Sequence, residues 1–250
     1  MGTLVLRVTV LWLCATASWG APTDLLTAAT RGPGPTVNAQ QATLGVPMQI
    51  VLLLTGLTLL PVLLMSVTPF LRITLVLHFL RQAIGTQATP SNPVLIGLAM
   101  FLTMMIMQPT LQKSYEEGWQ PYEQGTLAGD AAMKKGMEPV RGFLVKYVRE
   151  KDVQMLLDVS HTAPPAKAAD LELRILMPAY VLSELKTGFQ IGAMLFLPFL
   201  IIDLLVASVT LSVGIVQLPP AMVSSPFKIL LFVLVDGWNL VAGSLVRSFY

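Results

Sequence analysis

Three charged side chains stand inside otherwise apolar stretches of this 250-residue chain: Asp203, Lys228 and Asp236. Placing a charge in lipid costs several kcal/mol, so such residues usually face a partner or a water-filled cavity. They could hold helices together, or they could carry ions or protons. Contact between helices is the simpler interpretation, and it makes all three candidates for buried charges.

Asp203 and Lys228 have opposite charges and suit an ion pair. If Gly214–Pro226 is the turn of a hairpin, Asp203 lies roughly 16 Å before the turn along a helix. Lys228 lies only two residues after the same turn. Within one hairpin the two charges would then sit at different depths. We therefore expect the pair to form between neighbouring, staggered subunits of a protein that is stable only as an oligomer.

The same turn has a second possible role. Its tip, Ile215-Val216-Gln217, is largely apolar, with a hinge at Gly214 and a stiff stop at Pro219-Pro220. It is either a plain hairpin turn or a constriction that closes a pore, because a narrow apolar ring blocks ions by excluding water.

Patterns that would indicate catalysis or cofactor binding are absent from the sequence. It has no phosphate-binding glycine loop, no H-E-x-x-H pair and no paired cysteines. Its two histidines, His78 and His161, fall in different regions. We therefore predict no enzyme activity, no cofactor and no metal. The net charge of +2 is too small to indicate nucleic-acid binding.

Apolar segments dominate the chain and indicate an all-α membrane protein. Hydrophobic residues make up 54% of it and charged residues 12%, with a mean hydropathy of +0.69. Prolines beside or inside the apolar segments predict bent helical hairpins. The second segment is short, about 21 Å as a helix, against a hydrocarbon core of about 30 Å. The four segments are Met48–Val67, Val94–Met107, Phe189–Val213 and Phe227–Val246.

Residues 108–186 differ, because most of the chain's charges lie there and mark a water-facing region. A helix with one packing face is expected from the i, i+3, i+4 spacing of Val140, Phe143, Leu144, Tyr147 and Val148. Asp152 is suited to cap a second short helix. A further helix is expected at Leu171–Leu185, bent near Pro178.

Residues 1–20 are typical of a secretory signal. Arg7 precedes the apolar stretch Val8–Ala17, and small residues follow up to Gly20. Cleavage is expected after Gly20 or after Ala17. A first membrane anchor is the alternative. The single cysteine, Cys14, falls inside this signal. Residues 21–47, rich in proline and glycine, are expected to form a flexible leader.

Charge also suggests a topology. The segment Pro69–Pro93 carries Arg72 and Arg81 and no acidic residue, so it is expected to face the cytoplasm. Region 108–186, with mixed charges, would then be periplasmic. The predicted organisation is a signal, a leader, a first apolar helical pair, a helical periplasmic region and a second apolar hairpin, at residues 1–20, 21–47, 48–107, 108–186 and 187–250.

Five strings carry a resemblance to a known family, and together they cover about residues 46–250. They resemble the FliP/SctR family of type III secretion systems, and the expected signal and the last 60 or so residues favour its flagellar branch. The strings are Phe70–Ile73 (FLRI), Leu80–Gln87 (LRQAIGTQ), Ser183–Gly192 (SELKTGFQIG), Leu197–Asp203 (LPFLIID) and Pro226–Trp238 (PFKILLFVLVDGW).

The resemblance implies a pore-forming subunit of the flagellar export gate in the bacterial inner membrane, within the flagellar basal body. It implies a homo-oligomer, taken as a pentamer, that assembles with FliQ and FliR and passes unfolded flagellar export substrates. It also implies bent hairpins, much of which lie above the membrane plane. A small-solute transporter and a non-conducting assembly scaffold remain the alternatives, although a transporter should show internal repeats that are not seen here.

One departure from the family pattern concerns the constriction. The resemblance implies three methionines before the double proline, and Ile215, Val216 and Gln217 stand there instead. Ile and Val keep the surface apolar but are stiffer than Met, and Gln217 adds an amide. A soft methionine gasket is therefore not expected in this chain.

Overall fold

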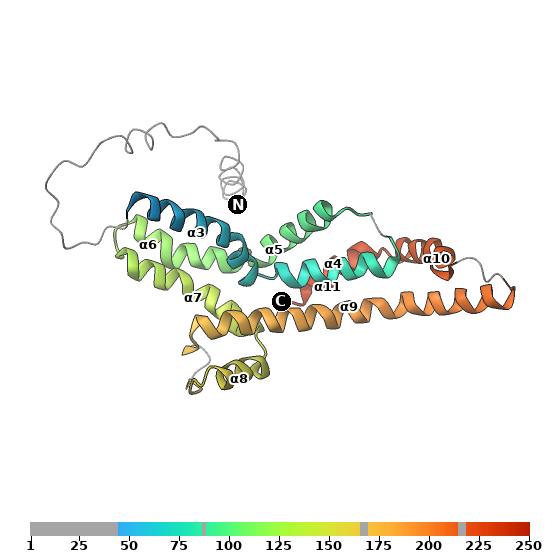
Figure 1. Ribbon diagram of the computed structural model, residues 1–250. Helices are drawn as coiled ribbons and strands as arrows, with labels where there is room; N and C mark the ends of the chain where they lie inside the picture. Colours follow the sequence, from blue (N-terminus) through green and yellow to red (C-terminus); the bar gives the residue numbers. More distant parts are fainter. Residues whose placement is uncertain (1–44, 87–88, 166–169, 215–218) are drawn as a thin grey trace. The chain divides into compact units, whose positions relative to one another are not determined.

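The computed structural model describes residues 45–86, 89–165, 170–214 and 219–250. The described residues form helices and no strand, as the sequence predicts (Figure 1). The expected signal and nearly all of the expected leader lie outside them. The elements are α3 Val46–Ser66, α4 Phe70–Ile84, α5 Asn92–Ser114, the π-helical turn η1 Tyr115–Trp119, α6 Gln120–Glu123, α7 Gly129–Tyr147, α8 Glu150–Val159, α9 Leu173–Ser212, α10 Pro220–Leu234 and α11 Gly237–Arg247.

Three stretches of helix among the described residues are long and apolar enough to cross a membrane: Pro47–Ser66, Asn92–Glu123 and Leu173–Ser212. Helices α10 and α11 are bent by 64° at a short break and together could make a fourth. The prediction of an all-α membrane protein with four main apolar segments is therefore confirmed.

The second apolar segment is longer than the sequence predicted. Helix α5 has 23 residues and continues through Pro109, where the prediction had already ended the segment. Its length is about 34 Å at 1.5 Å per residue, which is enough for a hydrocarbon core of about 30 Å. The prediction failed because Gln108 and Pro109 were taken as the start of a water-facing region.

Helix α9 is one unbroken element of 40 residues. The sequence predicted two separate helices here, with a boundary between the fourth and fifth regions after residue 186. The polar residues at that boundary stay helical: the Thr187 hydroxyl donates 2.8 Å to the Ser183 carbonyl, and Gly188 is buried against Leu75 of α4. At about 60 Å, α9 is roughly twice as long as the hydrocarbon core is thick.

The contact between α4 and α9 is the most extensive contact between two elements of the described chain (Figure 1). The buried face of α4 carries Ile73, Val76, Leu77 and Leu80. Two glycines of α9 allow the close approach, because a side chain at Gly188 would overlap Leu75 and one at Gly192 would overlap Phe79. The segment Pro69–Pro93, which the sequence predicted to face the cytoplasm, thus contains a helix of the packed core, α4.

The amphipathic stripe of the water-facing region is confirmed. All five of its residues are buried or half-buried: Val140, Phe143, Leu144, Tyr147 and Val148. Helices α7 and α8 both contact α9. The prediction that Asp152 caps α8 is wrong, because Arg149 is the N-cap residue and Asp152 lies in the first turn.

Candidate functional site

The expected ion pair between Asp203 and Lys228 lies inside one chain. Lys228 Nζ is 2.6 Å from Asp203 Oδ2, and the Ser224 hydroxyl donates to Asp203 Oδ1 at 2.5 Å. One carboxylate on α9 therefore accepts hydrogen bonds from two residues of α10. Lys228 is buried and Asp203 is half-buried. The prediction that this pair joins neighbouring subunits is corrected: it closes the α9–α10 hairpin.

The correction has a simple geometric cause. Helix α10 begins at Pro220 and contains Pro226, whereas the prediction counted all of Gly214–Pro226 as turn. Asp203 lies nine residues before the end of α9 at Ser212, and Lys228 lies eight residues after the start of α10. Residues at nearly equal distances from a hairpin's turn lie level with each other. The charges therefore meet without a second subunit.

Helix α4 ends beside this pair. Its C-cap, Gly85, has a φ of +83° and donates its backbone N–H to the Gln82 carbonyl. Glycine reaches that left-handed conformation without the steric cost of a side chain. A Cβ at Gly85 would lie 3.6 Å from the Ser225 hydroxyl and 4.0 Å from Lys228 Cδ. Three helices therefore meet at the ion pair.

The predicted constriction, Ile215, Val216 and Gln217, lies outside the described residues. The nearest described residues on either side of it are Gly214 and Pro219. Gly214 has a φ of +82°, which favours glycine, and Pro219 is the N-cap of α10. The role of the three tip residues stays a prediction.

Asp236 occupies the break between α10 and α11. Its φ is +51°, uncommon for a residue with a side chain, and its carboxylate accepts a hydrogen bond of 3.2 Å from Asn239 Nδ2. The ring of Phe232 meets that of Trp238 edge-on across the bend. Asp236 is exposed in the single chain, so its burial remains a prediction about an assembly.

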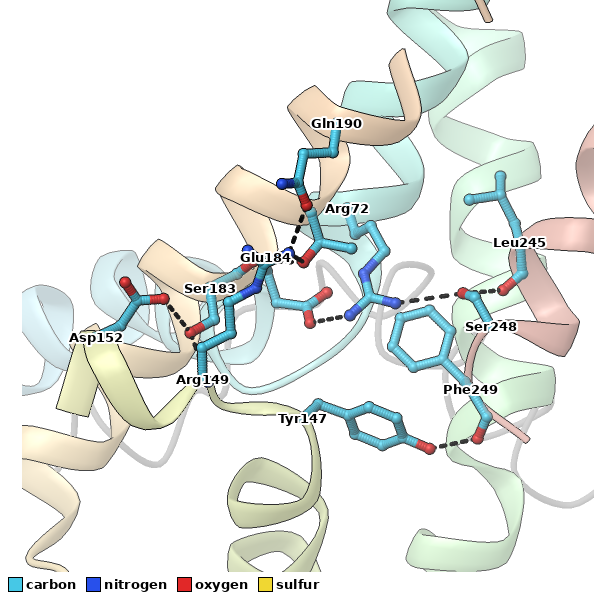
Figure 2. Close-up of polar contacts among 11 residues, drawn as sticks. Arg72, Tyr147, Arg149, Asp152, Ser183, Glu184, Gln190, Leu245, Ser248 and Phe249 are labelled. Carbon is cyan, nitrogen blue, oxygen red and sulfur yellow. Dashed lines mark hydrogen bonds and ion pairs between the residues drawn. The ribbon is translucent and has the colours of Figure 1, made fainter. Parts of the chain in front are cut away.

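A second ion pair, which the sequence did not predict, joins Arg72 of α4 to Glu184 of α9 (Figure 2). Both side chains are almost completely buried. Arg72 Nη1 also donates 3.2 Å to the Ser248 hydroxyl, and its guanidinium lies 4.0 Å from the ring centre of Phe249. The Tyr147 hydroxyl donates to the Phe249 carbonyl. The cluster therefore ties α4, α7 and α9 to the segment after α11.

A hydrogen-bond chain extends this cluster to α8 (Figure 2). The Ser183 hydroxyl donates 2.7 Å to Asp152 Oδ2 and accepts 2.9 Å from the backbone N–H of Arg149. The Arg149 guanidinium donates to Thr187 and Gln190 of α9. Asp152 thus binds a neighbouring helix instead of capping its own.

The Arg72–Glu184 pair contradicts the predicted topology. Arg72 belongs to the segment expected in the cytoplasm, and Glu184 to the region expected in the periplasm. Side chains in contact cannot lie on opposite faces of a membrane, so that assignment is wrong for these helices. Arg72 could have been flagged as a buried charge by the criterion that selected Asp203, since Phe70, Leu71 and Ile73 surround it.

The described residues contain no group of three or more His, Cys, Asp or Glu side chains placed to hold a metal ion. Neither ion pair adjoins a histidine in the described contacts. The geometry offers charge-stabilised joints between helices.

These helices and joints define a class: a helical membrane protein whose long apolar hairpins are fastened by interhelical ion pairs. Residues 53–245 match the FliP family. The chain is 47% identical to Flagellar biosynthetic protein FliP of Pectobacterium carotovorum subsp. carotovorum over 203 residues, 81% of this chain and 79% of that protein.

Two further relatives, also named Flagellar biosynthetic protein FliP, agree. The protein of Bacillus subtilis is 46% identical over 202 residues, 81% of this chain and 91% of that protein. The protein of Caulobacter vibrioides is 48% identical over 202 residues, 81% of this chain and 76% of that protein. The chain belongs to the FliP family, and the resemblance inferred from the five strings is confirmed.

Proposed function

We propose that this chain is a pore-forming subunit of the flagellar type III protein export gate. Several copies assemble with FliQ and FliR in the inner membrane and pass unfolded flagellar proteins. Helices α7 and α8, with the part of α4 that they join through the buried cluster, lie on the periplasmic side. Membership of the FliP family supports this proposal, as does the name of its relatives, flagellar biosynthetic proteins.

The observation that carries the proposal is the surface of the α9–α10 hairpin. Beyond the Asp203–Lys228 pair, both arms expose large apolar side chains in the single chain. Apolar surface of this extent is covered either by lipid or by other subunits. Copies arranged around an axis would cover one face of each hairpin and bring the turns together. The exposed side chains include Leu204, Leu205, Val209, Leu211, Met222 and Phe227.

The turns would then form the closed state of the conduit. Ile215 and Val216 supply an apolar ring that excludes water and ions. Gln217 matters little if its amide is hydrogen-bonded sideways to a neighbouring turn or to backbone. The chain does no chemistry in this scheme, and its charged residues serve as joints between helices.

The test is the resting ion conductance of cells that carry a variant gate. Deleting residues 215–217 should make resting cells leak ions, because the apolar ring is lost. Gln217→Met is the matched control and should leave resting conductance nearly unchanged. If the deletion leaks no more than the parent protein, the closure lies elsewhere and Met100–Met107 becomes the next candidate.

The same experiment separates a gate from a scaffold. A scaffold would lose export without leaking when the turn is deleted, because other proteins would form the barrier. The assembled complex should be isolated from the parent strain and from the deletion strain. The ion leaks of the two strains can be compared only if their complexes contain the same subunits.

A further inference from the structure

Helix α11 is an arm that follows a sharp bend. The chain turns by 64° between α10 and α11, and Asp236 in the bend has a φ of +51°. One face of α11 is buried through Val241 and Leu245, about one helical turn apart. Its main backbone neighbours among the described elements are α10 and α5, and both contacts are small beside that of α4 with α9. The position of α11 therefore depends strongly on how the segment after its end, Ser248–Tyr250, is held.

Phe249 of this segment is enclosed by side chains of α4 and α7. Its residue is only 4% exposed. The ring of Tyr147 meets it edge-on with centres 5.1 Å apart, and the ring of Phe143 stacks with it at 6.3 Å. The Arg72 guanidinium lies 4.0 Å from the ring centre. Aromatic pairs and a cation over a ring add attraction to that of burial alone. Helices α4 and α7 thus supply a site for one aromatic side chain.

Two residues of this site contact the segment twice (Figure 2). Arg72 lies against the Phe249 ring and donates 3.2 Å from Nη1 to the Ser248 hydroxyl. Tyr147 meets the same ring, and its hydroxyl donates to the Phe249 carbonyl. The site therefore holds a side chain and the backbone of the segment together. Tyr250, the next residue, is 74% exposed.

We infer that Ser248–Phe249 is a latch that fastens the α10–α11 arm to the helices of the buried cluster. With Phe249 in its site, α11 lies against these helices and the bend at Asp236 is fixed. With Phe249 out of its site, the bend can absorb a change in the direction of α11, as residues at the ends of helices do in hinges. The latch couples the second apolar hairpin to the rest of the chain. It goes beyond the proposed pore and does not depend on it.

Amide hydrogen exchange in α11 tests the latch, because exchange reports how often a segment opens. Full-length Phe249→Ala and the parent protein would be purified in the same mild detergent, and peptides from α4, α7 and α11 compared by mass spectrometry. We expect α11 to exchange roughly tenfold faster or more, since its opening no longer breaks the contacts of Phe249. Peptides from α4 and α7 should change far less, because the Arg72–Glu184 pair remains.

Tyr250→Ala is the matched control. It removes an exposed ring and should leave exchange in α11 unchanged. Tyr147→Phe is a milder second variant, which decides the question if Phe249→Ala does not fold. It keeps the ring of residue 147 but removes the hydrogen bond to the Phe249 carbonyl, so exchange in α11 should rise roughly two- to tenfold. The inference is overturned if α11 exchanges at the parent's rate in the folded variants, or if α4 and α7 speed up as much as α11.

Discussion

Helix α9 carries an acidic residue in each half, and each is paired with a basic residue from another helix. Glu184 and Arg72 have side chains exposed by 0% and 5%, within a packed body of α4, α7, α8 and the first half of α9. Asp203 and Lys228 have side chains exposed by 36% and 8%, in a hairpin whose other residues largely face outward.

The difference shows which part of the chain buries its side chains without a partner. The body buries its own polar groups and apolar side chains, so one chain suffices to form it. The α9–α10 hairpin holds its two arms together but leaves their apolar faces uncovered. Its ion pair therefore fixes the register of the arms, and their packing must come from lipid or from other chains.

Breaking the buried pair should have the largest effect. Glu184→Ala leaves Arg72 as an unpaired buried cation, which should cost about 3–5 kcal/mol of folding stability. Thermal unfolding in mild detergent, followed by circular dichroism, measures the loss.

The control is a double variant, Arg72→Met with Glu184→Leu. Removing both charges also removes Arg72 Nε and Glu184 Oε2, which lack hydrogen-bond partners among the described residues. Its stability should recover most of the way to that of the parent, since an apolar pair of similar size can replace a buried ion pair. A double variant as unstable as Glu184→Ala would contradict this account of the cluster.

A smaller effect is expected from filling the contact between α4 and α9. Gly192→Ala would push a methyl group into the ring of Phe79. That ring is held edge-on by Phe189 and Phe196, at 5.3 Å and 6.1 Å between centres. Overpacking of this kind costs about 1–3 kcal/mol, which would appear as a lower unfolding temperature.

Gly97→Ala in α5 is the matched control. Apart from Gly97 itself, its chain neighbours and the nearby backbone of α5, no atom of the described chain lies within 4 Å of an added Cβ there, and alanine is the better helix former. It should leave the unfolding temperature unchanged or raise it. If Gly192→Ala and Gly97→Ala lowered the unfolding temperature equally, close packing between α4 and α9 at Gly192 would not explain the loss.

The hairpin contact can be tested by cross-linking, with Lys228→Met included so that no unpaired cation is left buried. Asp203→Cys with Ser224→Cys places two thiols where a carboxylate now accepts a hydrogen bond of 2.5 Å. A short bis-maleimide should join them within one chain, leaving the mass on a denaturing gel at that of a monomer. Predominant cross-linked dimers would restore the original expectation of a pair between subunits.

Sequence reasoning recovered the residue types that matter in the hairpin but not their partners. Asp203 and Lys228 stand out because a charge in an apolar run is costly. Their arrangement was missed because Pro219, Pro220 and Pro226 suggested a long turn. Proline fits the first turn of a helix, where no intrahelical N–H bond is lost, so α10 begins earlier.

The buried cluster was harder to foresee, because Arg72 and Glu184 are 112 residues apart in the chain and no local pattern links them. The length of α9 was missed for a related reason. Lys186, Thr187 and Gly188 are polar or small and suggest a helix boundary. The close contact of Gly188 with Leu75 instead favours a continuous helix. Tertiary contacts decided both features.

The central claim is that other copies of this chain complete the apolar hairpin. Native mass spectrometry of the parent protein, extracted in mild detergent, tests it most directly. The account predicts that the stable form is a species that contains several copies of the chain. A well-behaved monomer with full helicity would contradict the claim, because its hairpin would then be stable with its apolar faces uncovered.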